Sequence, residues 1–263
     1  MSKILYANGD SFVFGMECLD HNSREEKNKE FAFPKIVADQ LGFDTYINNA
    51  YNGATNTFIF RTVVEDLLQM EKEGIKPEDV FVVLGWTSLF RSEVDAFPWH
   101  RSFLRSDQEA KTVMSTAWAP PECRDHQVVF MNPWFEQSVT SPDGRRVSPD
   151  SKIMPVLFEY IWTDSLQVPL HQSRIIAMHG FLKSRGYKHI FVNTSLQLPF
   201  TMLENHQPEF FNMENETFFD WAFANYPKSH REENHFDPIP HKAYGQRLVE
   251  YIIRNNLWPL SAP

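Results

Sequence analysis

The sequence predicts a three-layer α/β/α domain built on a mostly parallel, doubly wound sheet. Apolar runs typical of buried strands alternate along the chain with segments whose apolar residues recur at helical spacing. Small polar residues also follow three of the predicted strands, where such sheets place their ligand site. A chain of 263 residues with 42% hydrophobic composition can bury a full core. We therefore expect one domain over residues 1–263.

The predicted strands are short, apolar and rich in β-branched or aromatic residues, as buried parallel strands are. They read KILYANG at 3–9, DTYINNA at 44–50, EDVFVVLG at 78–85 and YKHIFVNTSL at 187–196. The first strand leads directly into Gly9-Asp10-Ser11, which puts an acid and a hydroxyl at the end of an apolar run. This position calls for a functional explanation.

Helical segments separate the strands and carry recognisable ends. Gly42 is placed to end the first of them, Thr55 or Asn56 to cap the second, and Gly74 to end it. In the last, Asp237 is placed as the cap and a proline follows in the first turn, where its missing N–H is harmless. The segments span 30–42, 55–74, 171–186 and 237–256.

Two segments interrupt the alternation of strands and helices. Residues from about 89 to 154 are rich in proline, tryptophan and turn-forming residues, which predicts an insertion. Residues from about 198 to 230 are aromatic and acidic. They form either a lid-like wall of a pocket or a satellite core under a long loop.

Charge and cysteine content exclude several classes of function. With 34 acidic and 25 basic residues the formal charge is −9, which argues against binding of nucleic acid or an anionic membrane surface. Cys18 and Cys123 are the only cysteines and form no CxxC pair, so no disulfide framework or cysteine zinc site is indicated. No dinucleotide or P-loop motif occurs, and we expect neither cofactor nor metal. Without a signal-peptide or membrane-span pattern, a cytoplasmic location is expected.

Four short blocks carry a resemblance to a known family. NGDSF at 8–12, NNAYNGATN at 48–56, VVLGWTS at 82–88 and a histidine just before the last helix together resemble the GDSL/SGNH hydrolase superfamily. The resemblance covers the flanks of the chain and not its middle. It implies a flavodoxin-like parallel sheet, serine ester hydrolysis and Ser11 as the nucleophile.

The chemistry of serine supports this assignment independently of the resemblance. A serine hydroxyl is a poor nucleophile at neutral pH and needs a basic histidine within hydrogen-bond reach. Two histidines lie near the last helix, His235 in the preceding loop and His241 one turn inside the helix. Because Asp237 and Pro238 read as cap and first turn, we favour His235 over His241 as the base.

The third member of the triad differs from the family pattern. The resemblance places an aspartate three residues before the histidine, where this chain has Glu232, with Glu233 as the alternate. A glutamate can orient an imidazole as an aspartate does, although its extra methylene changes the reach. Asp237 is a third option, but a cap residue commits its carboxylate to backbone N–H groups.

An oxyanion formed on the substrate also needs hydrogen-bond donors. The resemblance assigns this role to the backbone N–H groups of Ser11 and Gly53 and to an asparagine of the third block, a position that Thr87 occupies here. Asn56, Arg91 or a residue of the insertion could supply the missing donor, and Asn56 and Arg91 are also candidates for substrate binding.

The residues together favour hydrolysis of an ester whose acyl group is small and whose acceptor is a carbohydrate or another polar molecule. We therefore expect the partner to be a small-molecule or glycan ester. An acyltransferase could use the same triad with a non-water acceptor. The absent asparagine favours a third interpretation, a binding protein that keeps the fold with weakened activity.

Overall fold

A four-stranded parallel sheet forms the centre of the protein. The computed structural model describes residues 2–20, 25–89, 92–96, 127–131, 164–195, 208–211, 216–231 and 235–259. The sheet has the strand order β2-β1-β3-β6, and each neighbouring pair is parallel. Its strands are β1 (Ile4–Asn8), β2 (Thr45–Asn48), β3 (Val80–Trp86) and β6 (Lys188–Asn193). The parallel sheet predicted from the sequence is confirmed.

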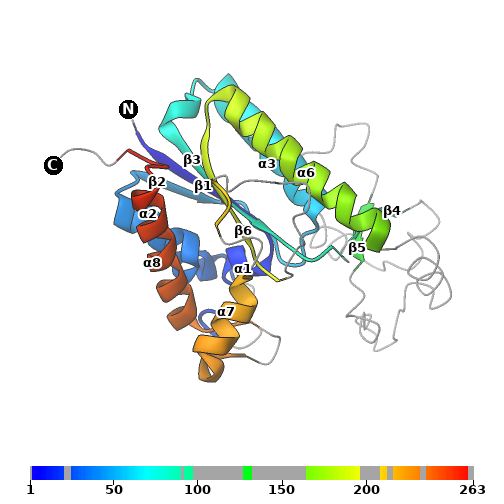
Figure 1. Cartoon of the computed structure of the whole chain (residues 1–263), viewed down its shortest axis with the longest axis vertical. Helices are drawn as coiled ribbons and strands as arrows, with labels where there is room; N and C mark the ends of the chain where they lie inside the picture. The colour runs from blue at the N-terminus through cyan, green and yellow to red at the C-terminus, as the bar shows by residue number, and fades with distance from the viewer. Residues whose placement is uncertain are drawn as a thin grey trace.

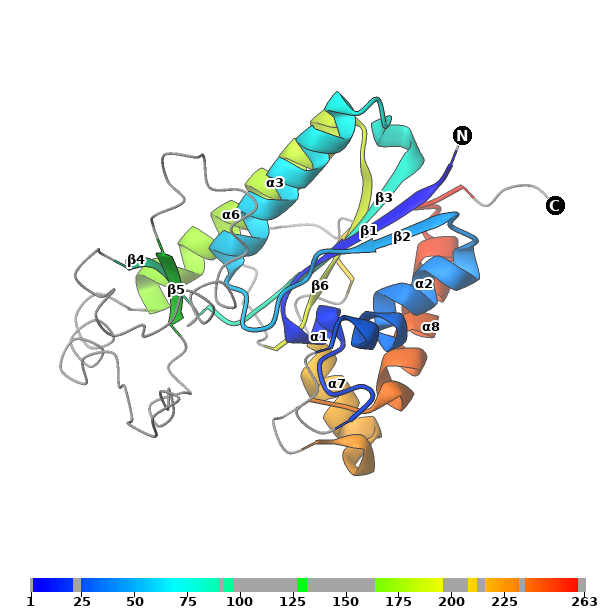
Figure 2. The ribbon, with the colours of Figure 1, turned by 180° about the vertical axis from the view of Figure 1, so that it is seen from behind.

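Helices cover both faces of this sheet (Figures 1 and 2). On one face lie α3 (Asn56–Lys72) and α6 (Asp164–Arg185), side by side in both views. The other face carries α2 (Phe33–Leu41) and α8 (Pro238–Arg254), with the short helices α1 (Ser11–Phe14) and α7 (Phe218–Asn225) near one edge. Short 3-10 turns span Glu26–Phe31, Pro77–Asp79 and Pro227–Ser229. The result is the three-layer arrangement that the sequence predicts.

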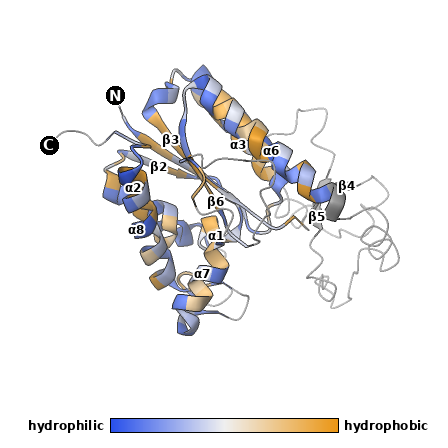
Figure 3. Cartoon of the chain, viewed as in Figure 1, coloured by the Kyte–Doolittle hydropathy of each residue, from blue (hydrophilic) through white to orange (hydrophobic). Residues whose placement is uncertain are grey.

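The two faces of the sheet have separate cores, which explains why the strands are apolar throughout. Leu5 and Ala7 of β1 pack with α2 and α8, whereas Ile4 and Tyr6 pack with α3 and α6. This division follows from the alternation of side chains along a strand. All seven residues of β3 are buried. The helices, in contrast, combine hydrophilic and hydrophobic residues along their length (Figure 3).

The helix ends confirm the capping residues read from the sequence. Gly42 follows α2 in the left-handed conformation, with φ of 70°. Thr55 caps α3 by accepting a hydrogen bond from the Phe58 N–H, and Asp237 caps α8 by accepting one from the Ile239 N–H. α6 is longer than expected, because it begins at Asp164.

The strand order determines where a ligand site can form. The chain passes from β1 to β2 through α2 and from β2 to β3 through α3, and these helices lie on opposite faces. The crevice at such a switch point opens between the carboxyl ends of β1 and β3. Ser11 follows β1 and Thr87 follows β3, so both belong to this edge of the sheet.

The two irregular segments are described only in part. Within residues 89–154 the structure describes Leu89, which is buried in the core on the α3 and α6 face, and an antiparallel pair, β4 (Ser92–Ala96) and β5 (Gln127–Met131). The rest of that segment lies outside the described residues. Within 198–230 the described residues Phe211, Phe218 and Ala222 belong to the core on the α2 and α8 face. The extent of the insertion and the lid remain predictions. Among the described helices, none is both long and apolar enough to cross a membrane.

Close packing of α8 on α2 gives a prediction about stability. A Cβ atom at Gly245 would lie 2.6 Å from Ile36 Cβ and 2.9 Å from the Phe33 carbonyl oxygen. Gly245→Ala is therefore expected to lower the free energy of unfolding by about 1–3 kcal/mol, measured by urea titration. Gly180→Ala is the matched control, because a Cβ there meets nothing within 4 Å. Because Gly180 lies on an exposed helix surface, Gly180→Ala should raise the free energy of unfolding by up to about 1 kcal/mol. Equal effects of the two substitutions would contradict this packing.

Candidate active site

The residues after β1 form a one-turn helix that begins with the predicted nucleophile. Asp10 is its N-cap and accepts a hydrogen bond from the Phe12 N–H at 3.0 Å. Gly15 ends the helix in the left-handed conformation, with φ of 80°. The turn lies so close to the sheet that a Cβ at Gly9 would be 2.3 Å from Val13 Cγ2 and 2.9 Å from the Gly85 carbonyl oxygen. Glycine at position 9 is thus required by space, and Ser11 becomes the first helical residue.

The structure brings His235 to Ser11 across 224 residues of sequence. Ser11 Oγ lies 2.7 Å from His235 Nε2, a short hydrogen bond. Ser11 is 3% exposed. The ring of Phe12 lies beside the imidazole, with centroids 5.0 Å apart. This geometry is the one a serine nucleophile and its general base require.

Backbone pairing holds His235 in its loop. His230 and Phe236 form an antiparallel bridge. The Arg231 N–H donates to the His235 carbonyl at 2.7 Å, and the Asp237 N–H donates to the Ser229 carbonyl at 3.0 Å. Phe236 is fully buried. The imidazole is therefore anchored from both sides of its position, just before the cap of α8.

A carboxylate that the sequence analysis did not single out lies on the other side of the imidazole. Glu17 Oε2 is 3.4 Å from His235 Nδ1, and the Glu17 side chain is fully buried. Glu232 and Glu233, the acids expected from the sequence, lie outside the described residues. Glu17 lies six residues after the serine, and no pattern in the sequence marks it as the partner of His235.

Asp10, the acid next to the predicted nucleophile, has a structural role. Its carboxylate is fully buried and accepts hydrogen bonds from the hydroxyls of Thr87 at 2.7 Å and Thr194 at 2.8 Å. It also caps α1. Asp10 thus ties the ends of β1, β3 and β6 together and fixes the turn that carries Ser11.

This network changes the expected role of Thr87. A hydroxyl has one hydrogen to donate, and Thr87 directs it to Asp10 Oδ2. The oxyanion role expected of the Thr87 side chain therefore lacks its donor. Gly53 lies in a turn with φ of 77°, a conformation that favours glycine. Arg91 lies outside the described residues.

Asn56 also has a different set of contacts from the one expected of a substrate-binding residue. Its side-chain oxygen accepts from the Thr87 N–H at 2.9 Å, and its amide group donates to the Thr87 carbonyl at 2.8 Å and the Ser88 carbonyl at 3.4 Å. Asn56 is 3% exposed. Both amide hydrogens of Asn56 are donated to backbone carbonyls, so Asn56 holds the loop after β3 in place and has no donor left for substrate.

His241 is a structural residue of α8. It is fully buried, and its Nδ1 accepts a hydrogen bond from the Phe33 N–H at 3.3 Å, so it supplies a partner at the start of α2. Burial, and secondarily the nearby His235, lower the pKa of His241 to about 3. Its position and protonation state fit packing, whereas His235 contacts Ser11.

The buried neutral histidine predicts acid sensitivity. The pKa of His241 lies below its value near 6.5 in the unfolded chain, so the unfolded state binds more protons in this pH range. The free energy of unfolding therefore falls as pH decreases from about 6.5 towards 3. Burial lowers the pKa of His171 to about 3 as well. Each such group contributes up to about 1.4 kcal/mol per pH unit in this window. We expect urea titrations of His241→Gln to show a smaller loss from pH 6 to 4.5 than wild type. An equal dependence of the free energy of unfolding on pH in wild type and His241→Gln would contradict this prediction.

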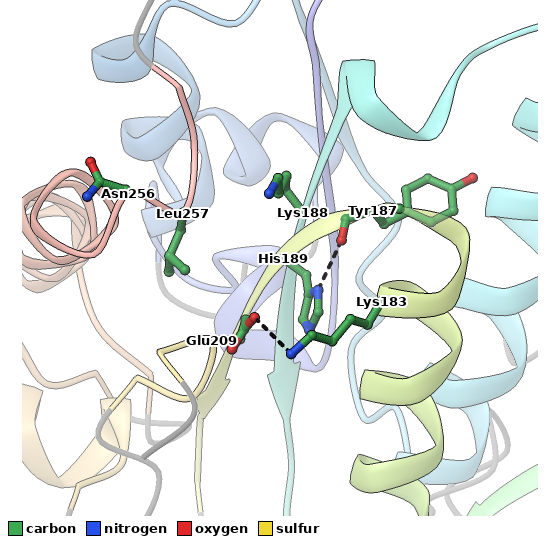
Figure 4. A pocket seen from close by; sticks show the side chains of 8 residues that line it. Lys183, Tyr187, Lys188, His189, Glu209, Asn256 and Leu257 are labelled. Carbon is green, nitrogen blue, oxygen red and sulfur yellow. Dashed lines mark hydrogen bonds and ion pairs between the residues drawn. The ribbon is translucent and has the colours of Figure 1, made fainter. Parts of the chain in front are cut away.

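A cavity of about 270 Å³ lies at the amino end of β6, away from the edge that carries Ser11 (Figure 4). Lys183, His189 and Glu209 line it, with Lys183 Nζ 4.0 Å from Glu209 Oε1. His189 Nε2 is 2.9 Å from His179 Nδ1, and burial lowers the pKa of His189 to about 4. Among the described residues that line the cavity, none is a serine or a cysteine. In the part of the chain described, no cluster of three or more metal-binding side chains occurs.

One family model matches part of the chain. A family model described as "Family of unknown function (DUF6071)" matches residues 16–103, which begin after Ser11. A search of curated proteins found no match to the chain.

Several solved structures resemble the chain at low sequence identity. The lipase Lip_vut3 from a goat rumen metagenome is 11% identical, with a TM-score of 0.45 over 99% of this chain and 100% of its own. The acetyl xylan esterase Est2A from Butyrivibrio proteoclasticus is 12% identical, with a TM-score of 0.47 over 98% of this chain and 65% of its own. A protein assigned to the lipolytic G-D-S-L family, from Desulfitobacterium hafniense DCB-2, is 12% identical, with a TM-score of 0.40 over 95% and 99%. Likeness at this level assigns no activity, and the functional argument depends on the site.

Proposed function

We propose that the protein is a serine hydrolase that cleaves a small acyl ester, with Ser11 as nucleophile and His235 as general base. The observation that carries the proposal is the 2.7 Å contact between Ser11 Oγ and His235 Nε2. It lies at the edge of the sheet where ligands of doubly wound folds bind. A hydroxyl and an imidazole at this distance can transfer a proton without rearrangement.

The reaction proceeds through a covalent acyl-enzyme. Ser11 Oγ attacks the ester carbonyl carbon while its proton passes to His235 Nε2. The tetrahedral intermediate collapses, the bond to the alcohol breaks, and His235 returns the proton to the departing alcohol. Water, deprotonated by His235, then attacks the acyl carbon. The bond from that carbon to Ser11 Oγ breaks, His235 returns the proton to Ser11 Oγ, and the carboxylic acid leaves.

The backbone N–H groups of Ser11 and Gly53 are the proposed donors to the oxyanion. Ser11 opens α1, and the first N–H groups of a helix have no partner within the helix. Loss of one oxyanion donor costs on the order of 100-fold in kcat in other serine hydrolases. Since the Thr87 hydroxyl is directed to Asp10, we expect a lower kcat than a hydrolase with a third side-chain donor would have.

The surroundings of Ser11 support a small acyl group. Ser11 is 3% exposed, and an acetyl group needs less space beside a buried hydroxyl than a long acyl chain does. The formal charge of −9 supports an uncharged acceptor such as a glycan. The test is covalent labelling by a fluorophosphonate together with turnover of aryl acetate and aryl octanoate. A folded protein that takes no label and cleaves neither ester would overturn the proposal.

The contacts of Thr87 favour one alternative, a binding protein with weakened catalysis. If the site binds an ester without turning it over, the protein should bind an acetylated glycan while ester hydrolysis stays at the buffer rate. Isothermal titration with the acetylated and deacetylated glycan separates this alternative from hydrolysis.

A further inference from the structure

We propose that Glu17 is the acid that orients His235 and stabilises its protonated form, so that nucleophile and acid both come from residues 11–17. The proposal rests on the proposed function and deepens it. Its geometric basis is the 3.4 Å contact between Glu17 Oε2 and His235 Nδ1, opposite the nitrogen that contacts Ser11. This distance is longer than a well-formed hydrogen bond, and the contact becomes ionic when His235 carries a proton. Catalytic hydrogen bonds in unliganded enzymes are often long and shorten when substrate binds.

The local backbone places Glu17 at the imidazole. The Gly15 and Met16 N–H groups both donate to the Ser11 carbonyl, at 3.0 and 2.9 Å, which turns the chain back over the nucleophile. Glu17 itself has φ of 64°, in the left-handed region. This conformation is unfavourable for a residue other than glycine. Such strain is kept where the surrounding structure fixes it, often at functional sites.

Contacts with Asn28 hold this segment from the other side. A Cβ at Gly15 would lie 2.8 Å from the Asn28 carbonyl oxygen, so the turn packs directly on this residue. The Asn28 side-chain oxygen accepts from the Leu19 N–H at 3.0 Å. Gly15 and Leu19 are thus fixed on both sides of Glu17, and the carboxylate has little freedom to move away from His235.

The other described carboxylates near the site are engaged elsewhere. Asp10 accepts from Thr87, Thr194 and the Phe12 N–H. Asp237 caps α8 through the Ile239 N–H. Within the described part of the chain, Glu17 is the carboxylate that faces His235 Nδ1.

Complete burial gives the Glu17 charge a large effect on the imidazole. When His235 takes the proton of Ser11 it becomes a cation beside a carboxylate that is shielded from water. The attraction between opposite charges is stronger in such a site than in solvent. A carboxylate facing Nδ1 also favours the tautomer with hydrogen on Nδ1, which leaves Nε2 to accept the proton from Ser11. Glu17 is therefore a positioning residue that acts through His235.

Substitution of Glu17 tests this role. Glu17→Gln keeps the shape of the side chain and removes its charge, and we expect kcat for aryl acetate to fall by roughly 10²- to 10⁴-fold with KM changed by less than about threefold. Glu17→Asp keeps the charge and should recover part of the rate. Glu232→Gln and Glu233→Gln test the rival acids expected from the sequence, and if Glu17 is the acid each should keep at least about half of the wild-type kcat.

A spectroscopic measurement makes the result independent of turnover. The Nδ1 hydrogen of an imidazole facing a carboxylate gives a downfield proton NMR signal, which should appear in wild type and disappear in Glu17→Gln and in His235→Gln. If wild type shows this signal but no turnover or labelling, the hydrolase proposal fails and the Glu17 contact stands. The Glu17 proposal is overturned if Glu17→Gln keeps signal and rate, or if Glu232→Gln or Glu233→Gln causes the large loss in its place.

Discussion

An alanine at position 11 is expected to abolish ester cleavage. Ser11→Ala removes the oxygen that lies 2.7 Å from His235 Nε2, and with it the atom that would form the acyl-enzyme. We expect kcat for an aryl acetate to fall by roughly 10³-fold or more, as removal of the nucleophile does in other serine hydrolases. Fluorophosphonate labelling, followed by intact mass, should disappear completely. The fold should be retained, because alanine fits where serine is already buried.

A second serine gives the control. Ser184 lies on α6, away from Ser11 and His235, and its hydroxyl donates a hydrogen bond to the Phe181 carbonyl. Ser184→Ala should keep both label and turnover. If Ser11→Ala keeps the label and the rate of wild type, the nucleophile lies elsewhere and the proposed function is wrong. Circular dichroism on each variant separates loss of chemistry from loss of structure.

The sheet and its covering helices could be predicted from sequence because their signals are local. The run at 80–84 is apolar at every position, and β3 is buried at every residue. Thr55 and Asp237 cap the helices that their positions indicate. Such signals depend on backbone hydrogen bonding and side-chain periodicity within about one element. The one-turn helix at Ser11 was missed because four residues are too short to show a period.

The site was only partly predictable, since its contacts join distant segments. Ser11 and His235 were chosen from motif and capping position, and the structure places them in contact. The engagement of the Thr87 hydroxyl by Asp10 depends on how β1 and β3 align, which the sequence does not state. Glu17 could not be found by spacing from the histidine, because it approaches His235 from the other end of the chain.

Removal of the imidazole is the second large effect that we expect. His235→Ala leaves Ser11 without a group to accept its proton, so kcat for aryl acetate should fall by roughly 10³-fold or more. The double variant Ser11→Ala with His235→Ala should be no slower than either single variant, because residues that act as one unit are not additive. Rates are compared per folded molecule, after a urea titration of each variant.

The choice of control histidine follows from burial. His241→Ala would open a cavity at a fully buried site and remove the acceptor for the Phe33 N–H, so a loss of activity there would be ambiguous. His230 is a better control, because it belongs to the same loop as His235. Its ring contacts Phe236, with centroids 5.5 Å apart. In the described structure the histidine that hydrogen-bonds Ser11 is His235 and not His230. His230→Ala should lose less than about fivefold in kcat, as residues outside the catalytic unit do. An equal loss in both variants would mean that the loop acts through packing, and a full rate in His235→Ala would remove the general base from the mechanism.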